Sequence, residues 1–79
     1  MDLEDYDGAR PYLERLLVID ATREDIHAAL ITCLSRLGRR SQALAQYEAC
    51  ADALKRELAL EPGPDLQRLH ALLTAEENL

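Results

Sequence analysis

The sequence predicts an all-α fold with about four helices arranged as a right-handed α-α superhelix. Apolar residues recur at steps of three and four through most of the chain, which is the period of an amphipathic helix. Leu and Ala, both strong helix formers, dominate the apolar residues. The three Gly and three Pro fall near the ends of the predicted helices. We therefore expect one small helical domain that spans residues 1–79.

The first predicted helix covers residues 8–20, after an acidic segment, 1–7, that we expect to fray. Pro11 suits the first turn of this helix, where its missing N–H costs little. We interpret residues 1–22 as the end of a preceding repeat, so Val18 and its neighbours would be left partly uncovered on one side. The apolar stripe of the helix consists of Tyr12, Leu13, Leu16, Leu17 and Ile19.

A central helical hairpin is predicted over residues 23–60, with helices at 23–37 and 41–60. The apolar arc of its first helix covers nearly half the surface, which suggests packing against more than one neighbour. That arc consists of Ile26, His27, Leu30, Ile31, Cys33, Leu34 and Leu37. The stripe of the second helix consists of Ala43, Leu44, Tyr47, Cys50, Ala51, Leu54 and Leu58.

Capping residues are predicted at three ends of the hairpin helices. Thr22 stands where an N-cap belongs, and Asp25, three residues later, approximates a capping box. Ser41 can cap the second helix. Gly38 ends the first helix because it readily adopts the left-handed conformation of a C-terminal cap.

A last helix is predicted over residues 64–76 within a capping segment, 64–79. The sequence Glu61-Pro-Gly-Pro64 is a firm break before it. His70 falls outside the apolar stripe of this helix, so we expect it on the polar side. We also expect residues 75–79 to fray. Such a helix can cover the exposed flank of a repeat array. The stripe consists of Leu66, Leu69, Leu72 and Leu73.

An internal repeat links the first helix to the second helix of the hairpin. Three pairs of positions are each separated by 34 residues: Ala9 and Ala43, Leu13 and Tyr47, and Leu16 and Cys50. A period of 34 residues in helix pairs is the tetratricopeptide spacing. The chain departs from that repeat at His27, where the repeat has Trp, and at positions 21 and 55, which lack its closing Pro.

Catalytic and ligand-binding motifs are absent from the sequence, which contains neither a phosphate-binding loop nor a nucleophile–base motif. The spacing of the two His and two Cys fits no common zinc site. We therefore expect no enzyme activity, no cofactor and no metal. We expect Cys33 and Cys50 to be reduced core thiols in a cytoplasmic protein. No run of residues is long enough to span a membrane, and the net charge of −6 disfavours nucleic-acid binding by this chain alone.

One polar surface is a candidate for binding a protein partner. It lies on the first hairpin helix opposite the core, on the side that lines the concave groove of tetratricopeptide arrays. The charge of the chain is uneven, because residues 1–25 carry a net −5 whereas residues 26–47 hold three Arg and no acid. An ordinary solvated surface is the alternative interpretation of this pattern. The candidate partner-binding residues are Asp25, Thr32, Ser35, Arg36, Arg39 and Arg40.

Five short motifs resemble the bacterial transcriptional activator domain of the antibiotic regulatory protein family of actinobacterial regulators. They are Tyr12-Leu-Glu-Arg-Leu-Leu17, Arg23-Glu-Asp-Ile-His27, Gly38-Arg-Arg40, Ala43-Leu-Ala-Gln-Tyr47 and Glu61-Pro-Gly-Pro-Asp65. The similarity covers about residues 9–74. The family usually has Leu-Gly-Val-Glu-Pro where this chain has Leu58-Ala-Leu-Glu-Pro62, and the missing Gly favours a continuous helix there.

The resemblance implies a tetratricopeptide-like regulatory domain that contacts other domains of a regulator or the transcription machinery. In the family a winged-helix DNA-binding domain normally precedes this region. That domain is absent from the 79 residues, so we expect a C-terminal portion or a very short relative. Two alternatives stay open: a generic tetratricopeptide adaptor that binds a peptide, and a helical module that forms homodimers through the first helix.

Overall fold

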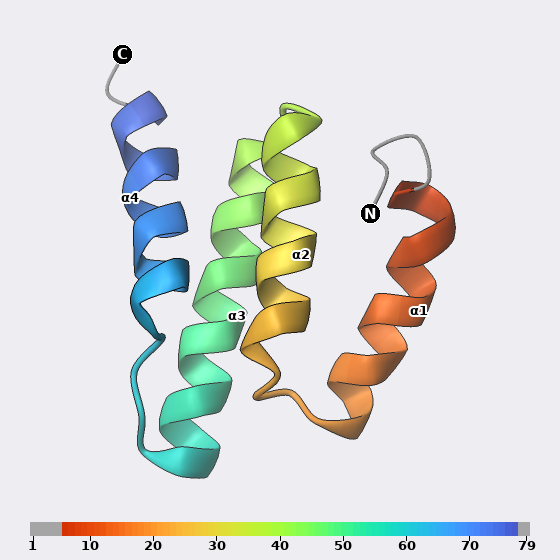
Figure 1. The fold of residues 1–79 in the computed structure, drawn as a ribbon, viewed down its shortest axis with the longest axis vertical. Coiled ribbons are helices and arrows are strands. Elements are labelled where there is room, and N and C mark those ends of the chain that lie inside the picture. The colour runs from red at the N-terminus through yellow and green to blue at the C-terminus, as the bar shows by residue number, and fades with distance from the viewer. Residues whose placement is uncertain (1–5, 78–79) are drawn as a thin grey trace.

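The structure, a computed structural model, describes residues 6–77, and it describes side chains for residues 8–75. The described residues form four helices and no strand, which confirms the all-α prediction. The helices are α1 (Tyr6–Ile19), α2 (Glu24–Arg36), α3 (Arg40–Leu58) and α4 (Pro64–Glu77). Figure 1 shows the antiparallel hairpin of α2 and α3 at the centre, with α1 and α4 on opposite sides of it.

Helix α2 is the centre of the core because it packs against α1, α3 and α4. This agrees with the wide apolar arc of its sequence. Leu30 and Ile31, at 2% and 0% exposure, lie at the middle of this packing. The buried cluster consists of Leu13, Ile26, Leu30, Ile31, Cys33, Leu34, Ala43, Cys50, Leu54, Leu66 and Leu73.

The turn between α2 and α3 is a Schellman motif centred on Gly38. Its φ of 78° is the left-handed conformation that glycine adopts without a steric penalty. The N–H of Arg39 donates to the carbonyl of Leu34 at 2.9 Å, and the N–H of Gly38 donates to that of Ser35 at 3.1 Å. The prediction that Gly38 ends this helix is confirmed.

Both predicted N-caps of the hairpin are wrong. Helix α2 begins at Glu24, so its N-cap residue is Arg23, while the Thr22 hydroxyl donates instead to the Asp20 carboxylate. That carboxylate also accepts the Thr22 backbone N–H, and these bonds lower the pKa of Asp20. The Thr22 side chain is therefore used within its own turn, and no capping box forms. Helix α3 begins at Arg40, and its N-cap residue makes no side-chain hydrogen bond.

Helix α3 ends at Leu58, so the prediction that the missing Gly favours a continuous helix is wrong. Ala59 adopts the left-handed conformation with φ 55°, although it carries a Cβ. Its N–H donates to the carbonyl of Lys55 at 3.1 Å, and the N–H of Leu60 donates to that of Leu54 at 3.2 Å. The Pro-Gly-Pro sequence that follows cannot extend a helix, so the chain must turn here whichever residue occupies position 59.

The outer helix ends also differ from the expected ones. Helix α1 begins at Tyr6, which makes Pro11 its sixth residue and not part of its first turn. Helix α4 continues to Glu77, so most of the segment expected to fray is helical, while positions 1–5 of the acidic segment lie outside the described residues. Several residues of the predicted apolar stripes are exposed: Tyr12, Ile19, Leu37, Leu58 and Leu72.

His27, which stands in place of the repeat's Trp, is buried at 3% exposure between two hydrogen bonds. Its Nε2 lies 2.9 Å from the Ala21 carbonyl oxygen, and its Nδ1 lies 2.7 Å from Nε2 of Gln46. A neutral ring with the proton on Nε2 satisfies both bonds, because Nε2 then donates and Nδ1 accepts. The ring therefore joins the loop before α2 to helix α3.

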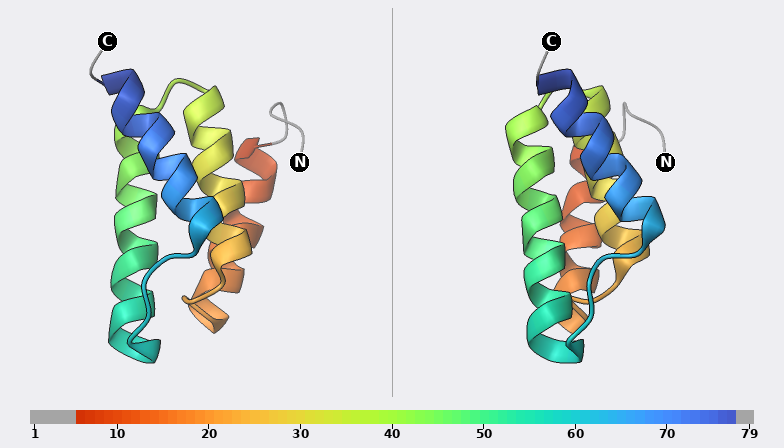
Figure 2. Two further views of the ribbon diagram at one scale, coloured as in Figure 1. Left: turned by 60° about the vertical axis from the view of Figure 1, so that its left-hand side comes forward. Right: turned by 90° about the vertical axis from the view of Figure 1, so that its left-hand side faces the viewer.

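Helix α4 packs against both members of the hairpin. Figure 2 shows α4 tilted relative to α3, with its first turn beside the first turn of α2. The rings of Tyr47 and His70 stack between α3 and α4, with centroids 4.3 Å apart and planes inclined by 16°. The prediction that His70 lies on the polar side of α4 is wrong, since the ring is half-buried against Tyr47.

Candidate functional site

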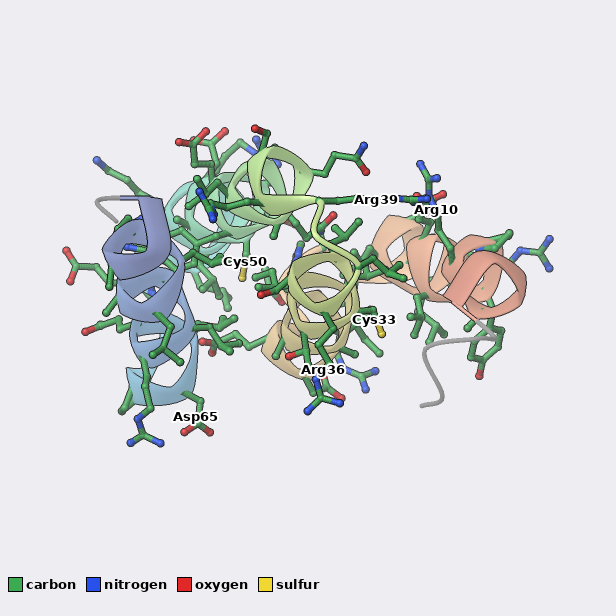
Figure 3. The ribbon with its side chains drawn as sticks, turned by 90° about the horizontal axis from the view of Figure 1, so that it is seen from above. Arg10, Cys33, Arg36, Arg39, Cys50 and Asp65 are labelled. Carbon is green, nitrogen blue, oxygen red and sulfur yellow. The ribbon has the colours of Figure 1, made fainter. Side chains whose placement is uncertain are left out.

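The outward face of α2 carries four of the six predicted partner-binding residues. Asp25, Thr32 and Arg36 point away from the core because they fall within a narrow arc of the helix, and Ser35 lies at the edge of that arc. Asp25 and Arg36 are exposed, while Thr32 and Ser35 are half-buried. In Figure 3, Arg36 of α2 and Asp65 of α4 project to the same side of the molecule.

The surface between α2 and α4, which Figure 1 shows ascending in the same direction, is called the groove below, although only its N-terminal end is hollowed. At its N-terminal end the groove contains a hollow of about 330 Å³. On α4, Leu69 and Leu72 follow Asp65 at steps of four and seven residues, so they share its side of the helix. The hollow is lined by Glu24, Asp25, Ala28, Gly63, Pro64, Asp65 and Leu66.

The N-terminal end of the groove is acidic because each of its helices begins with carboxylates. Oε1 of Glu24 accepts the Gly63 N–H at 2.7 Å, so this carboxylate is occupied in joining α2 to the start of α4. Asp25 forms two hydrogen bonds with the Arg23 guanidinium, at 2.7 and 3.0 Å. These bonds lower the pKa of Asp25 and raise that of Arg23. The carboxylate of Asp65 is highly exposed and lies 4.0 Å from Arg68.

The C-terminal end of the α2 face carries the opposite charge. Arg36 is exposed and forms no ion pair with any residue that the structure describes. Between the two charged ends, the α2 side of the groove has only small side chains: Ala28, Thr32 and Ser35. Along this surface the carboxylates of Asp25 and Asp65 thus lie at the N-terminal end, and Arg36 lies at the C-terminal end of α2, beyond the hollow.

Arg39 and Arg40 do not belong to this groove. Arg39 lies in the turn after α2, and Figure 3 shows its side chain directed toward the α1 side of the molecule. Arg40 is the first residue of α3. The sequence prediction placed Arg39 on the same helical arc as Arg36, but α2 ends at Arg36, so the helical period does not extend to Arg39. The prediction also missed the contribution of α4, since nothing in the pattern of α2 shows that α4 is its neighbour.

The described residues bring together no metal-binding arrangement. Between residues 6 and 77, no group of three or more His, Cys, Asp or Glu side chains could hold a metal ion. Cys33 and Cys50 are buried and form no disulfide. Burial, and then the negative charge of Glu24, raise the pKa of Cys50 to about 11. This thiol is therefore protonated and a poor nucleophile at neutral pH.

Comparison with known proteins places the chain in a family of bacterial regulators. The family model described as the bacterial transcriptional activator domain matches residues 1–73. The chain belongs to this family. The match confirms the resemblance seen in its sequence motifs, and it makes the chain an activator domain of a bacterial transcriptional regulator.

The activator domain is similar to Regulatory protein DnrI of Streptomyces peucetius, with 36% identity over 73 residues. The matched region is 91% of this chain but only 27% of the length of that protein. No solved structure matches the chain significantly. Among the residues of the activator domain that the structure describes, no helix has the length and apolar character needed to cross a membrane.

Proposed function

We propose that the activator domain is a non-enzymatic, cytoplasmic interaction module that binds a protein segment in the groove between α2 and α4. The observation that supports this proposal is the separation of charge along the groove, with Asp25 and Asp65 at one end and Arg36 at the other. The expected partners are other domains of the regulator or the transcription machinery. Membership of a transcriptional activator family supports this setting.

The groove favours an elongated segment with charges opposite to its own. Basic side chains of such a segment would lie near Asp25 and Asp65, and acidic ones near Arg36, since complementary potentials fix the orientation of a bound partner. The small side chains of Ala28 and Ser35 let the partner backbone approach closely. Leu72, which is 58% exposed on the groove side of α4, offers an apolar contact.

Charge reversal tests this proposal in binding assays with two purified probes. One probe is bacterial RNA polymerase holoenzyme, and the other is the winged-helix domain of a family regulator. We expect Arg36→Glu and Asp65→Lys each to weaken binding by about tenfold at moderate ionic strength. Asp52→Lys on the outside of α3 is the matched control, because Asp52 is exposed and lies outside the groove. Binding of the two groove variants with wild-type affinity would exclude the groove as the contact surface.

A binding test separates this proposal from a generic tetratricopeptide adaptor, and the charge of the chain separates it from direct DNA recognition. An adaptor would bind peptides unrelated to transcription, so binding to such peptides but not to either probe would favour that alternative. We assign DNA contact to a separate winged-helix domain of the regulator, because a chain with net charge −6 repels the phosphate backbone.

A second candidate function, homodimerisation through α1, is favoured by the apolar residues on its outer surface. Tyr12, Val18 and Ile19 are 65%, 86% and 77% exposed, although all three are large and apolar. Burying such surface stabilises an association by about 25 cal/mol per Å², and a symmetric pair is the simplest closed assembly. Sedimentation should show a dimer that Val18→Glu converts to a monomer, whereas a wild-type monomer throughout the concentration range would rule it out.

A further inference from the structure

A second hollow, of about 530 Å³, lies between α3 and α4 and shares no lining residue with the groove between α2 and α4. Its wall is formed by α3, by the loop that follows Ala59, and by the first half of α4. Hollows of this size are in the range that proteins use for small molecules, about 300–1,000 Å³. Neither the family match nor the proposed groove gives this hollow a role.

Two opposite charges line this hollow, and no side chain that the structure describes forms an ion pair with either of them. Lys55 projects from the last turns of α3, and Glu61 lies in the loop before α4. Both side chains are exposed, and neither forms an ion pair with another residue that the structure describes. Arg56 and Asp52 on the same helix, by contrast, lie within 3.7 Å of one another.

The rest of the wall is aromatic and apolar. The stacked pair of Tyr47 and His70 forms one side, and both rings are only half-buried. Leu60, at 55% exposure, and the buried Pro62 form the other side. The Gln67 amide donates to the Pro62 carbonyl at 2.7 Å, which ties this side to α4. An aromatic ring favours such a site, because it can extend an existing stack and bury apolar surface at once.

We propose that the hollow between α3 and α4 binds a small aromatic zwitterion, a ring that carries both a carboxylate and an ammonium group, as aromatic amino acids do. The ring packs against Tyr47, His70 and Leu60. The carboxylate faces the Lys55 ammonium, and the ligand's ammonium faces the Glu61 carboxylate. A ligand with only one of these charges leaves the other charged side chain without a partner.

Three related probes test this proposal: L-tryptophan, indole-3-acetate, which lacks the ammonium group, and tryptamine, which lacks the carboxylate. Each is titrated into the full isotope-labelled chain while amide chemical shifts are followed by NMR. We expect saturable shifts centred on Tyr47, Lys55 and His70, with tryptophan binding about fivefold more tightly than either analogue, as exposed ion pairs allow. Unsaturated or dispersed shifts for all three compounds at their solubility limits would overturn the proposal.

Charge-neutralising variants assign the role of each side chain. Lys55→Met should remove the advantage of tryptophan over tryptamine, and Glu61→Gln should remove its advantage over indole-3-acetate. Arg56→Met, next to the hollow but outside it, should bind all three probes as the wild type does. If Lys55→Met and Glu61→Gln leave the order of affinities unchanged, the charges do not select the ligand and the proposal fails.

The same chemistry could come from a peptide in which an aromatic residue lies between a basic and an acidic one. A capped Lys-Trp-Glu peptide distinguishes the two sources. Tighter binding of this peptide than of free tryptophan, with the same dependence on Lys55 and Glu61, identifies a peptide ligand. Weaker binding identifies the free amino acid. This test is independent of the groove between α2 and α4, because its variants leave that groove unchanged.

Discussion

The carboxylate of Glu24 accepts a hydrogen bond from the backbone N–H of Gly63, with 2.7 Å between Oε1 and N, although the two residues are 39 positions apart. The bond joins the first turn of α2 to the residue that precedes α4. It also places a negative charge at the N-terminus of α4, where the helix dipole favours one. The same carboxylate helps to raise the pKa of Cys50. Glu24 thus joins α2 to the start of α4 and also acts electrostatically on Cys50 of α3.

Removing this carboxylate should loosen α4. We expect Glu24→Ala to lower the free energy of unfolding by about 1–2 kcal/mol, because a hydrogen bond to a charged acceptor is lost at a half-buried site. Urea denaturation measures the change. Glu24→Gln keeps an acceptor oxygen and should cost less, and Glu57→Ala, an exposed acid on α3, is the control. Equal small effects from Glu24→Ala and Glu57→Ala would show that the bond does not stabilise the fold.

The centre of the core should be sensitive to truncation. Leu30 is 2% exposed, and Tyr47 packs against the same cluster from α3. We expect Leu30→Ala and Tyr47→Ala each to destabilise the domain by about 2–5 kcal/mol through lost burial and a residual cavity. Leu37→Ala, at a site that is 40% exposed, should cost much less. Thermal or urea melts that show a loss below about 0.5 kcal/mol for both core variants would place these residues outside the core.

A stabilising substitution is available at the end of α3. Ala59 holds φ 55°, a conformation that costs an L-residue with a Cβ about 1–2 kcal/mol. We therefore expect Ala59→Gly to raise the free energy of unfolding by about 1 kcal/mol, net of the extra chain entropy of glycine. Ala49→Gly, at an exposed position within α3, should lower it by a similar amount. The melting temperatures of the two variants should thus move in opposite directions, and a fall for Ala59→Gly would contradict this account.

The Cys50 thiol should make stability depend on alkaline pH. Its pKa in the folded protein is about 11, against an ordinary value of 9.0, because burial and then Glu24 disfavour the thiolate. A folded pKa above the unfolded one means that the folded state holds the proton more tightly. This stabilisation is complete below about pH 9 and is lost as the pH rises toward about 11. Urea denaturation of the wild type and of Cys50→Ala across this range isolates the effect, and parallel pH profiles would exclude it.

The activator domain by itself should not bind duplex DNA. With a net charge of −6, it releases few counterions from the phosphate backbone, and that release supplies most non-specific affinity. A gel-shift titration at physiological salt should show no complex below micromolar concentrations. A sub-micromolar complex would contradict this expectation and would assign DNA recognition to the domain itself.

Local features of the fold could be predicted because they depend on residues that are close in sequence. The periodic apolar residues of α2 and α4 predict helices from the local sequence alone. Gly38 ends α2 because the preference for a left-handed residue is intrinsic to glycine. The caps were harder to predict, since the Thr22 hydroxyl donates to the Asp20 carboxylate instead of accepting an N–H from the first turn of α2. Similarly, glycine's absence at position 59 did not extend α3, because the prolines downstream impose the turn.

The candidate site was only half determined by the sequence. Periodicity identifies the outward face of α2, and so Asp25, Thr32, Ser35 and Arg36. It cannot show that α4 lies beside α2 rather than beside α3 alone, because that choice depends on how the apolar surfaces of three helices pack together. In the folded domain Asp65 lies on the groove side of α4, Arg39 points away from the groove, and His70 is half-buried against Tyr47. The positions of the helices can be predicted from local periodicity, whereas the surfaces between them follow from burial of apolar area across long sequence separations, which only the tertiary structure decides.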